Sequence, residues 1–97
     1  MAVTVHVVAR FVAKPGKEQA LKTVLTALVA PTRRELGCYQ FDLLENPLDS
    51  RDFCFVERWE HDKAVDQHAE SAHVRQTLKD VEGLVEVPPD IRRYRQV

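Results

Sequence analysis

The sequence contains little cysteine, little glycine and no excess of one charge, and each shortage excludes a class of protein. Its two cysteines, Cys38 and Cys54, lack the CxxC spacing of zinc and redox sites, so we expect both to be reduced core residues. The three glycines form no GxGxxG, P-loop or GxSxG, so no motif indicates dinucleotide binding, nucleotide binding or a nucleophilic serine. The net charge of −1, without a basic cluster, argues against a nucleic-acid partner.

Long hydrophobic runs are also missing. No stretch of 18 apolar residues occurs and the N-terminus has no charged-then-apolar pattern, so we expect neither a membrane span nor a secretion signal, and a cytoplasmic protein. What is present is a chain of 97 residues, 44% hydrophobic and 30% charged, which is typical of a folded domain. This length predicts one domain over residues 1–97.

Hydrophobic periodicity predicts six elements in the order strand, helix, strand, strand, helix, strand. This order is that of a ferredoxin-like α+β sandwich, βαββαβ, with an antiparallel sheet. We expect Pro31 to kink the first helix and Pro88 and Pro89 to place the last strand at an edge. The expected strands are 3–13, 38–45, 51–60 and 84–97, and helical patterns cover 17–36 and 64–81.

The third predicted strand has two apolar faces. Side chains alternate along a strand, so one face carries aromatic residues and a carboxylate while the other carries Cys54, Val56 and Arg58. Two helices cover only one face of a four-stranded sheet, so we expect a homodimer packed sheet against sheet as an α+β barrel. The alternative is a monomer with scattered surface valines. The first of these two faces consists of Phe53, Phe55, Glu57 and Trp59.

Glu57 is the first candidate for a functional residue. A carboxylate buried among aromatic residues needs a hydrogen-bond donor or a proton, and either condition suits a reactive site. Alternatively, Glu57 forms an ion pair with Arg10 or Arg92 that links neighbouring strands. The sequence leaves both possibilities open.

The second helical pattern carries the histidines of interest. His68 lies on its apolar side and should face the sheet, where a histidine is more often a core residue than a catalyst. His73 shares a pocket with His68 only if the helix breaks near Ser71, and His61 is expected in solvent at the helix start. The role of His6 stays open. Because no ligand pattern is present, we predict no metal and no other cofactor.

Three segments, "KPG", "ELGCYQFDLLENP" and "VERWEHDKAVDQHAESAH", together resemble the antibiotic biosynthesis monooxygenase family over nearly the whole chain. The resemblance implies a ferredoxin-like fold that dimerises through its sheets, and a cofactor-independent monooxygenase for quinols or polyketide-like phenols. "FDLLENP" is most similar to the subgroup that includes the autoinducer-2 phosphate processing enzymes, which are isomerases. A haem-degrading branch has a tryptophan and a histidine where His68 and Leu78 stand here, so we expect no haem.

The resemblance also suggests roles for individual residues. We expect His68 to be the base or proton shuttle, Glu57 to orient it or a water, and His73 to gate the pocket or bind substrate at its edge. Two alternatives remain: a non-redox enzyme for a small phosphorylated metabolite, in which an arginine holds the anion, and a non-catalytic dimer that binds a small molecule. The expected substrate-binding residues are Trp59, Phe41, Phe55 and Arg92, with Arg93 or Arg34 as other candidates for the anion.

Overall fold

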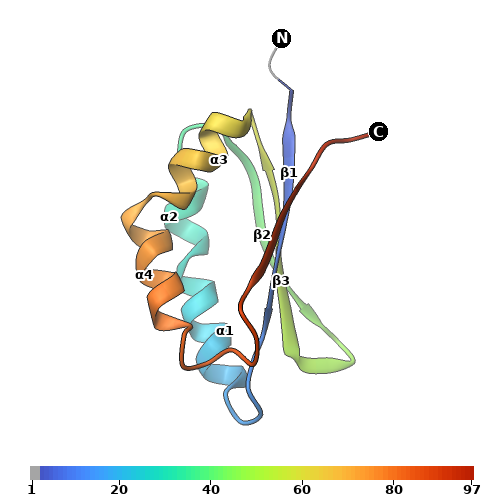
Figure 1. Ribbon diagram of the computed structural model, residues 1–97, viewed down its shortest axis with the longest axis vertical. Coiled ribbons are helices and arrows are strands. Elements are labelled where there is room, and N and C mark those ends of the chain that lie inside the picture. The colour runs from blue at the N-terminus through green and yellow to red at the C-terminus, as the bar shows by residue number, and fades with distance from the viewer. Residues whose placement is uncertain (1–2) are drawn as a thin grey trace.

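The computed structural model describes residues 3–97 and has one four-stranded antiparallel sheet with all its helices on one face (Figure 1). The strand order β2-β3-β1-β4 confirms the ferredoxin-like fold. Among residues 3–97, no helix is both long and apolar enough to span a membrane. The elements are β1 (Val5–Val12), α1 (Glu18–Ala27), α2 (Val29–Arg33), β2 (Cys38–Asn46), β3 (Asp49–Trp59), α3 (Asp62–Ala69), α4 (Ala72–Asp80) and β4 (Asp90–Tyr94).

The hydrophobic core lies between the helices and one face of the sheet. In the antiparallel pair of β1 and β3, Val7 is opposite Glu57 and Phe11 is opposite Phe53. All four side chains are buried, because the face they share is the one that the helices cover. The buried face predicted for β3 is therefore confirmed, including the carboxylate among its aromatic residues.

Each predicted helix is divided into two, for a local reason. Pro31 has no N–H to donate to the carbonyl of Ala27, and its ring clashes with that carbonyl, so α1 ends at Ala27 and α2 begins at Val29. Ser71 separates α3 from α4 and caps α4, since its Oγ accepts a hydrogen bond from the Val74 N–H at 3.3 Å. The kink expected from Pro31 is present, and the break near Ser71, which the sequence left open, is present too.

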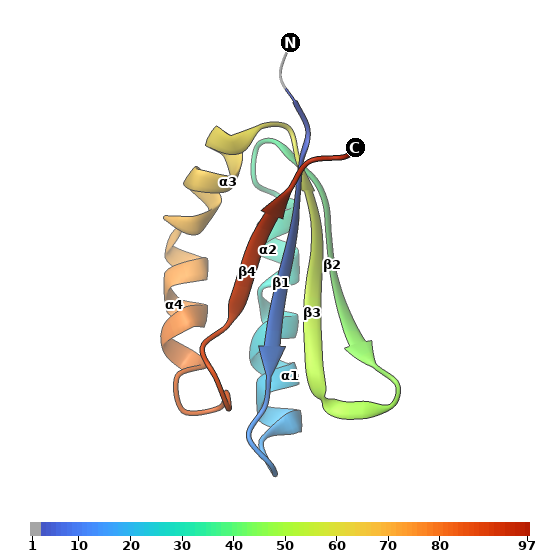
Figure 2. The same ribbon diagram turned by 45° about the vertical axis from the view of Figure 1, so that its right-hand side comes forward.

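The C-terminal strand is shorter than the sequence pattern indicates. β4 is an edge strand paired with β1 alone, and it starts only after the two prolines (Figure 2). Proline cannot donate to a strand ladder, so the expected strand 84–97 is reduced to an isolated bridge between Val85 and Ala13, followed by β4.

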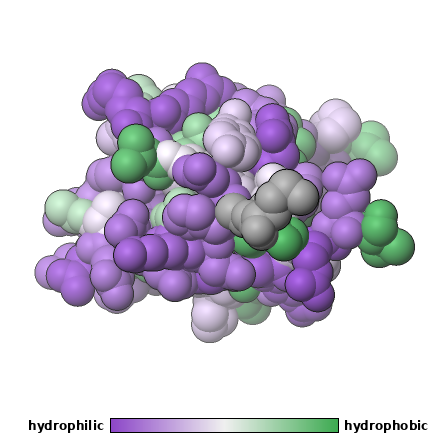
Figure 3. Space-filling view, turned by 90° about the horizontal axis from the view of Figure 1, so that it is seen from above, coloured by the Kyte–Doolittle hydropathy of each residue, from purple (hydrophilic) through white to green (hydrophobic). Residues whose placement is uncertain are grey.

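In the part of the chain that the structure describes, no helix lies over the opposite face of the sheet (Figure 1). Val8, Leu44 and Tyr94 are between 38% and 50% exposed there, beside ion pairs such as Arg10 with Asp52. By contrast, the end of the molecule that is viewed from above in Figure 3 is mainly hydrophilic, with isolated hydrophobic side chains. The exposed apolar residues of the sheet are thus set among charged pairs.

Gly37 joins the helical layer to β2 in a conformation that requires glycine. Its φ of +85° lies in the left-handed region, and a Cβ there would stand 2.9 Å from the Cβ of Ala64 on α3. Its carbonyl also accepts a hydrogen bond of 2.8 Å from the Glu60 N–H. Gly37 therefore allows α3 to approach the start of β2 closely.

We predict that Gly37→Ala destabilises the fold more than Gly16→Ala does. Gly16 has nearly the same φ, +84°, but a methyl group at its Cβ position would meet no atom within 4 Å, so its substitution costs only the backbone strain of about 1–2 kcal/mol. Gly37→Ala adds the overlap with Ala64, for about 1–3 kcal/mol more. Urea denaturation of both variants measures the difference, and equal losses of unfolding free energy would contradict this account.

Candidate functional site

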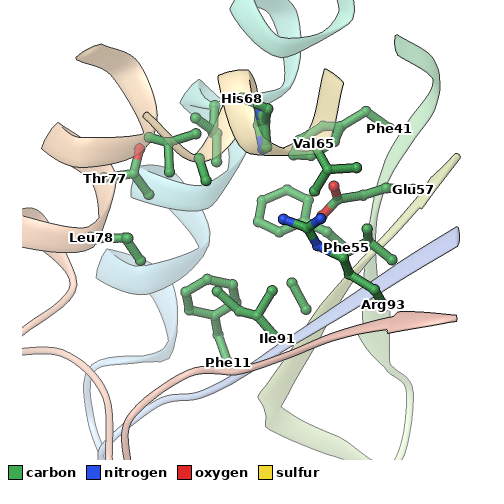
Figure 4. A pocket seen from close by; sticks show the side chains of 15 residues that line it. Phe11, Phe41, Phe55, Glu57, Val65, His68, Thr77, Leu78, Ile91 and Arg93 are labelled. Carbon is green, nitrogen blue, oxygen red and sulfur yellow. The ribbon is translucent and has the colours of Figure 1, made fainter. Parts of the chain in front are cut away.

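A cavity of about 130 Å³ lies between the helical layer and the covered face of the sheet (Figure 4). Aromatic and aliphatic side chains form most of its wall, and Phe41 stacks on Phe55 with ring centroids 4.6 Å apart. The polar groups at the wall are few. They are Glu57, His68, Thr77 and Arg93.

Glu57 is placed on the wall of the cavity by the alternation of β3 and is only 4% exposed. Burial raises its pKa to about 7, against the opposing effect of a 2.8 Å hydrogen bond that the Trp59 Nε1–H donates to its Oε1. The alternative of an ion pair is wrong, because Arg10 pairs with Asp52 and Arg92 with Asp90. Glu57 is a buried carboxyl group that exchanges its proton near neutral pH.

His68 extends from α3 toward the sheet and is 8% exposed. Its ring lies 4.6 Å from the Trp59 ring and 5.6 Å from the Phe41 ring, measured between centroids. Burial lowers the pKa of His68, while the neighbouring Glu35 carboxylate acts in the opposite direction. His68 Nδ1 stands 2.6 Å from Glu35 Oε2, so the carboxylate that orients His68 is Glu35, where the sequence suggested Glu57.

The break at Ser71 brings the second histidine to the same carboxylate. His73 Nε2 stands 2.8 Å from Glu35 Oε2, and the two imidazole rings are 6.2 Å apart. Ser71 fixes this bend, since its Oγ also donates a 2.7 Å hydrogen bond to the His68 carbonyl. His68 and His73 therefore converge on Glu35, but of the two only His68 lines the cavity.

Glu35 is the residue that sequence reasoning missed. It lies in the turn between α2 and β2, 33 and 38 positions from the histidines it contacts. Nothing in the local pattern distinguishes it from the other charged residues at the end of a helix, except that it precedes Gly37 by two positions. Only the packing of α3 and α4 beside that turn reveals its partners.

Glu35, His68 and His73 also offer three atoms of a kind that bind metals, all within 4.8 Å of one another. Tetrahedral zinc with bonds of 2.0–2.1 Å holds its ligand atoms about 3.3 Å apart. The Glu35 oxygen is closer than that to both nitrogens, at 2.6 and 2.8 Å, which are hydrogen-bond distances. The group fits a hydrogen-bonded cluster better than a metal site.

The structure also shows where the expected substrate-binding residues lie relative to the cavity. Arg92 faces away from the cavity, whereas its neighbour Arg93 lines it, because consecutive side chains of β4 point to opposite faces. Arg93 binds Asp62 at 3.0 Å and Asp66 at 2.6 Å, which ties β4 to α3. Trp59 is fully buried behind the wall, where it holds Glu57 and packs on His68, so it is not itself a lining residue.

The remaining two histidines lie apart from the cavity. His61 caps α3, since its Nδ1 accepts a 3.1 Å hydrogen bond from the Ala64 N–H, so its predicted position at the helix start is confirmed. His6 is on β1, paired in register with Arg58 and Tyr94, on the face without helices. Neither residue contributes to the cavity wall.

Comparisons of the sequence and of the structure with known proteins point to the same family. The profile of the family described as "Antibiotic biosynthesis monooxygenase" matches residues 4–80. "Putative monooxygenase Rv0793" of Mycobacterium tuberculosis is 38% identical over 73 residues, 75% of this chain and 71% of that protein. "Putative monooxygenase YcnE" of Bacillus subtilis is 30% identical over 80 residues, 82% and 84% of the two chains. The crystal structure of PA3566 from Pseudomonas aeruginosa has a TM-score of 0.93 at 33% identity, covering 100% of this chain and 97% of that one.

The raised pKa of Glu57 predicts how stability depends on pH. The folded protein holds this proton with a pKa of about 7, above the ordinary value of 4.5. The contribution of this proton to the free energy of unfolding is therefore complete below about pH 4.5. It is lost as pH rises through 7, by up to about 3 kcal/mol. Glu57→Gln stays neutral and should lack this loss in urea denaturation between pH 5 and pH 8. The exposed control Glu82→Gln should show the same fall of unfolding free energy with pH as the wild type. If the unfolding free energy changed in parallel with pH in all three proteins, the prediction would be contradicted.

Proposed function

Because the chain belongs to the antibiotic biosynthesis monooxygenase family, we propose that it is a cofactor-independent monooxygenase that oxidises a small electron-rich aromatic with dioxygen. The observation that carries the proposal is that His68 and Glu57 both line one apolar cavity. An apolar pocket that holds a buried imidazole and a carboxyl group with a pKa of about 7 is what a deprotonation-driven oxidation requires.

The size of the cavity limits the range of possible substrates. An engineered cavity of about 150 Å³ in another protein holds one benzene molecule, and the cavity here measures about 130 Å³. Its wall includes the stacked rings of Phe41 and Phe55, which suit a flat ring. Between the two substrate classes that the family resemblance implies, these dimensions favour a single-ring quinol over a polycyclic phenol.

The proposed reaction begins with proton transfer from the substrate hydroxyl to His68. The resulting phenolate gives one electron to dioxygen, and the radical pair combines into a carbon-bound peroxide, which regains the proton from His68. Loss of water from this hydroperoxide leaves a carbonyl, so a hydroquinone and dioxygen yield a hydroxyquinone and water. All the electrons come from the substrate. No external reductant is therefore needed.

Glu57 has a separate role in this scheme. With a pKa of about 7, it is partly protonated at neutral pH and is able to donate a hydrogen bond to a substrate oxygen or to a water. Trp59 holds one of its oxygens at 2.8 Å, which fixes the direction of the carboxyl group. We therefore assign Glu57 to orienting the substrate or a water, and His68 to proton transfer.

One observation favours a second candidate. Arg93 lines the cavity, and a guanidinium there would bind the phosphate of a small metabolite, as a non-redox isomerase requires. The Arg93 guanidinium already forms ion pairs with Asp62 and Asp66, however, which neutralise its charge. We therefore place the isomerase second to the monooxygenase. The titratable groups at the wall argue against a protein that only binds its ligand.

We predict that the chelator-treated protein consumes oxygen with single-ring hydroquinones faster than with three-ring anthrones. His68→Ala should lower kcat by about 10²-fold or more, because the general base is lost. An oxygen electrode measures both rates against the autoxidation background.

The matched control is His61→Ser, which removes an imidazole outside the cavity and keeps an oxygen acceptor at the N-cap of α3. Its rate should equal that of the wild type. If no hydroquinone or anthrone is consumed above background, the monooxygenase proposal fails and Arg93 becomes the residue to study.

We also propose that the protein is a homodimer joined through the sheet face without helices. Val8 and Val56 are opposite each other at the centre of this face, and Leu44 stands opposite Cys54 beside them. A second copy would cover these apolar side chains, and the charged pairs around them would form a polar rim.

Val56→Asp should therefore convert the dimer to a monomer, because the substitution would bury two unpaired carboxylates between the sheets. Sedimentation equilibrium should give twice 11.1 kDa for the wild type and 11.1 kDa for the variant. The exposed helical control Ala20→Glu should remain dimeric. A monomeric wild type at micromolar concentration would contradict the proposal.

A further inference from the structure

We propose that Glu35 is a positioning residue that fixes which nitrogen of His68 carries the proton, with His73 holding Glu35 in place. The inference rests on the proposed function, in which His68 accepts a proton from the substrate. It depends on the hydrogen bonds of the cluster and on the position of His68 on the cavity wall.

The hydrogen bonds determine where the protons lie. One oxygen, Glu35 Oε2, is within hydrogen-bond distance of His68 Nδ1, at 2.6 Å, and of His73 Nε2, at 2.8 Å. An ionised carboxylate only accepts hydrogen bonds, so both ring nitrogens must be protonated donors. A neutral His68 is then the Nδ1–H tautomer, whose Nε2 carries a lone pair.

This tautomer is the one that a base in the cavity needs. No residue among 3–97 contributes a hydrogen bond to His68 Nε2, while the ring borders the cavity. When Nε2 takes the proton of a phenol, the O–H bond breaks, the N–H bond forms, and the positive ring lies against the Glu35 carboxylate. The same carboxylate thus sets the tautomer before the transfer and stabilises the imidazolium after it.

His73 completes the arrangement. Its side chain is 30% exposed, against 10% for that of His68 and 17% for that of Glu35, so it forms the solvent side of the cluster. Its second hydrogen bond to the same oxygen restricts the rotation of the Glu35 side chain. Glu57 also lines the cavity, and burial together with the Glu35 charge raises the pKa of the Cys38 thiol.

The test reads the tautomer directly, by long-range ¹H–¹⁵N correlation spectra of the histidine rings in chelator-treated protein at pH 8. In the wild type we expect His68 to be protonated at Nδ1 and unprotonated at Nε2. In Glu35→Gln the side-chain amide is able to donate to Nδ1, and the ring should then carry its proton on Nε2. The matched control Glu82→Gln removes one exposed carboxylate and should leave the wild-type tautomer.

Kinetics with a hydroquinone provide the second readout. Glu35→Gln should lower kcat by about 10²-fold with a change in KM of less than about threefold, because the base, not the binding surface, is affected. A wild-type His68 protonated at Nε2 would overturn the proposal without any variant. So would a Glu35→Gln protein that keeps the wild-type tautomer and kcat. If the wild type consumes no oxygen, the proposed function fails, and the tautomer in the spectra still decides whether Glu35 positions His68.

Discussion

The burial of one face of β3 beneath the helical layer is the constraint on which the rest of the site depends. Side chains on that strand alternate between the two faces of the sheet, so the helices that cover Phe53, Phe55 and Trp59 also cover Glu57. Desolvation then raises the pKa of Glu57 to about 7, and Trp59 supplies the hydrogen bond that makes the burial tolerable. A strand that stabilises the core therefore also supplies a titratable group.

The helical layer contributes the second group through its interruptions. Had α3 and α4 been one continuous helix, His68 and His73 would lie about 140° apart around its axis. The break at Ser71 turns the chain, so both rings reach the carboxylate of Glu35. Gly37, two residues after Glu35, allows α3 to lie close enough for these contacts. Two local irregularities thus assemble the cluster.

The cavity and the cluster together would suit the cofactor-independent reaction that we propose. Quinols carry their own electrons, so the protein needs only to exclude water, hold a flat ring and move a proton. In the proposed scheme the apolar wall excludes water and holds the ring, Glu57 orients the substrate or a water, and His68 moves the proton. This division also explains why so small a domain suffices for the chemistry we propose.

The sequence by itself determined the order of elements, the buried face of β3 and the kink at Pro31, since alternation, helical spacing and proline act through neighbours in the chain, but it left the break near Ser71 open. It also singled out Glu57, His68 and the Phe41 and Phe55 wall, all of which line the cavity. The tertiary structure alone decided that Glu35 joins the histidines and that Arg93, instead of Arg92, borders the cavity. Those contacts join residues more than 30 positions apart or depend on the register of an edge strand, and no local pattern encodes either.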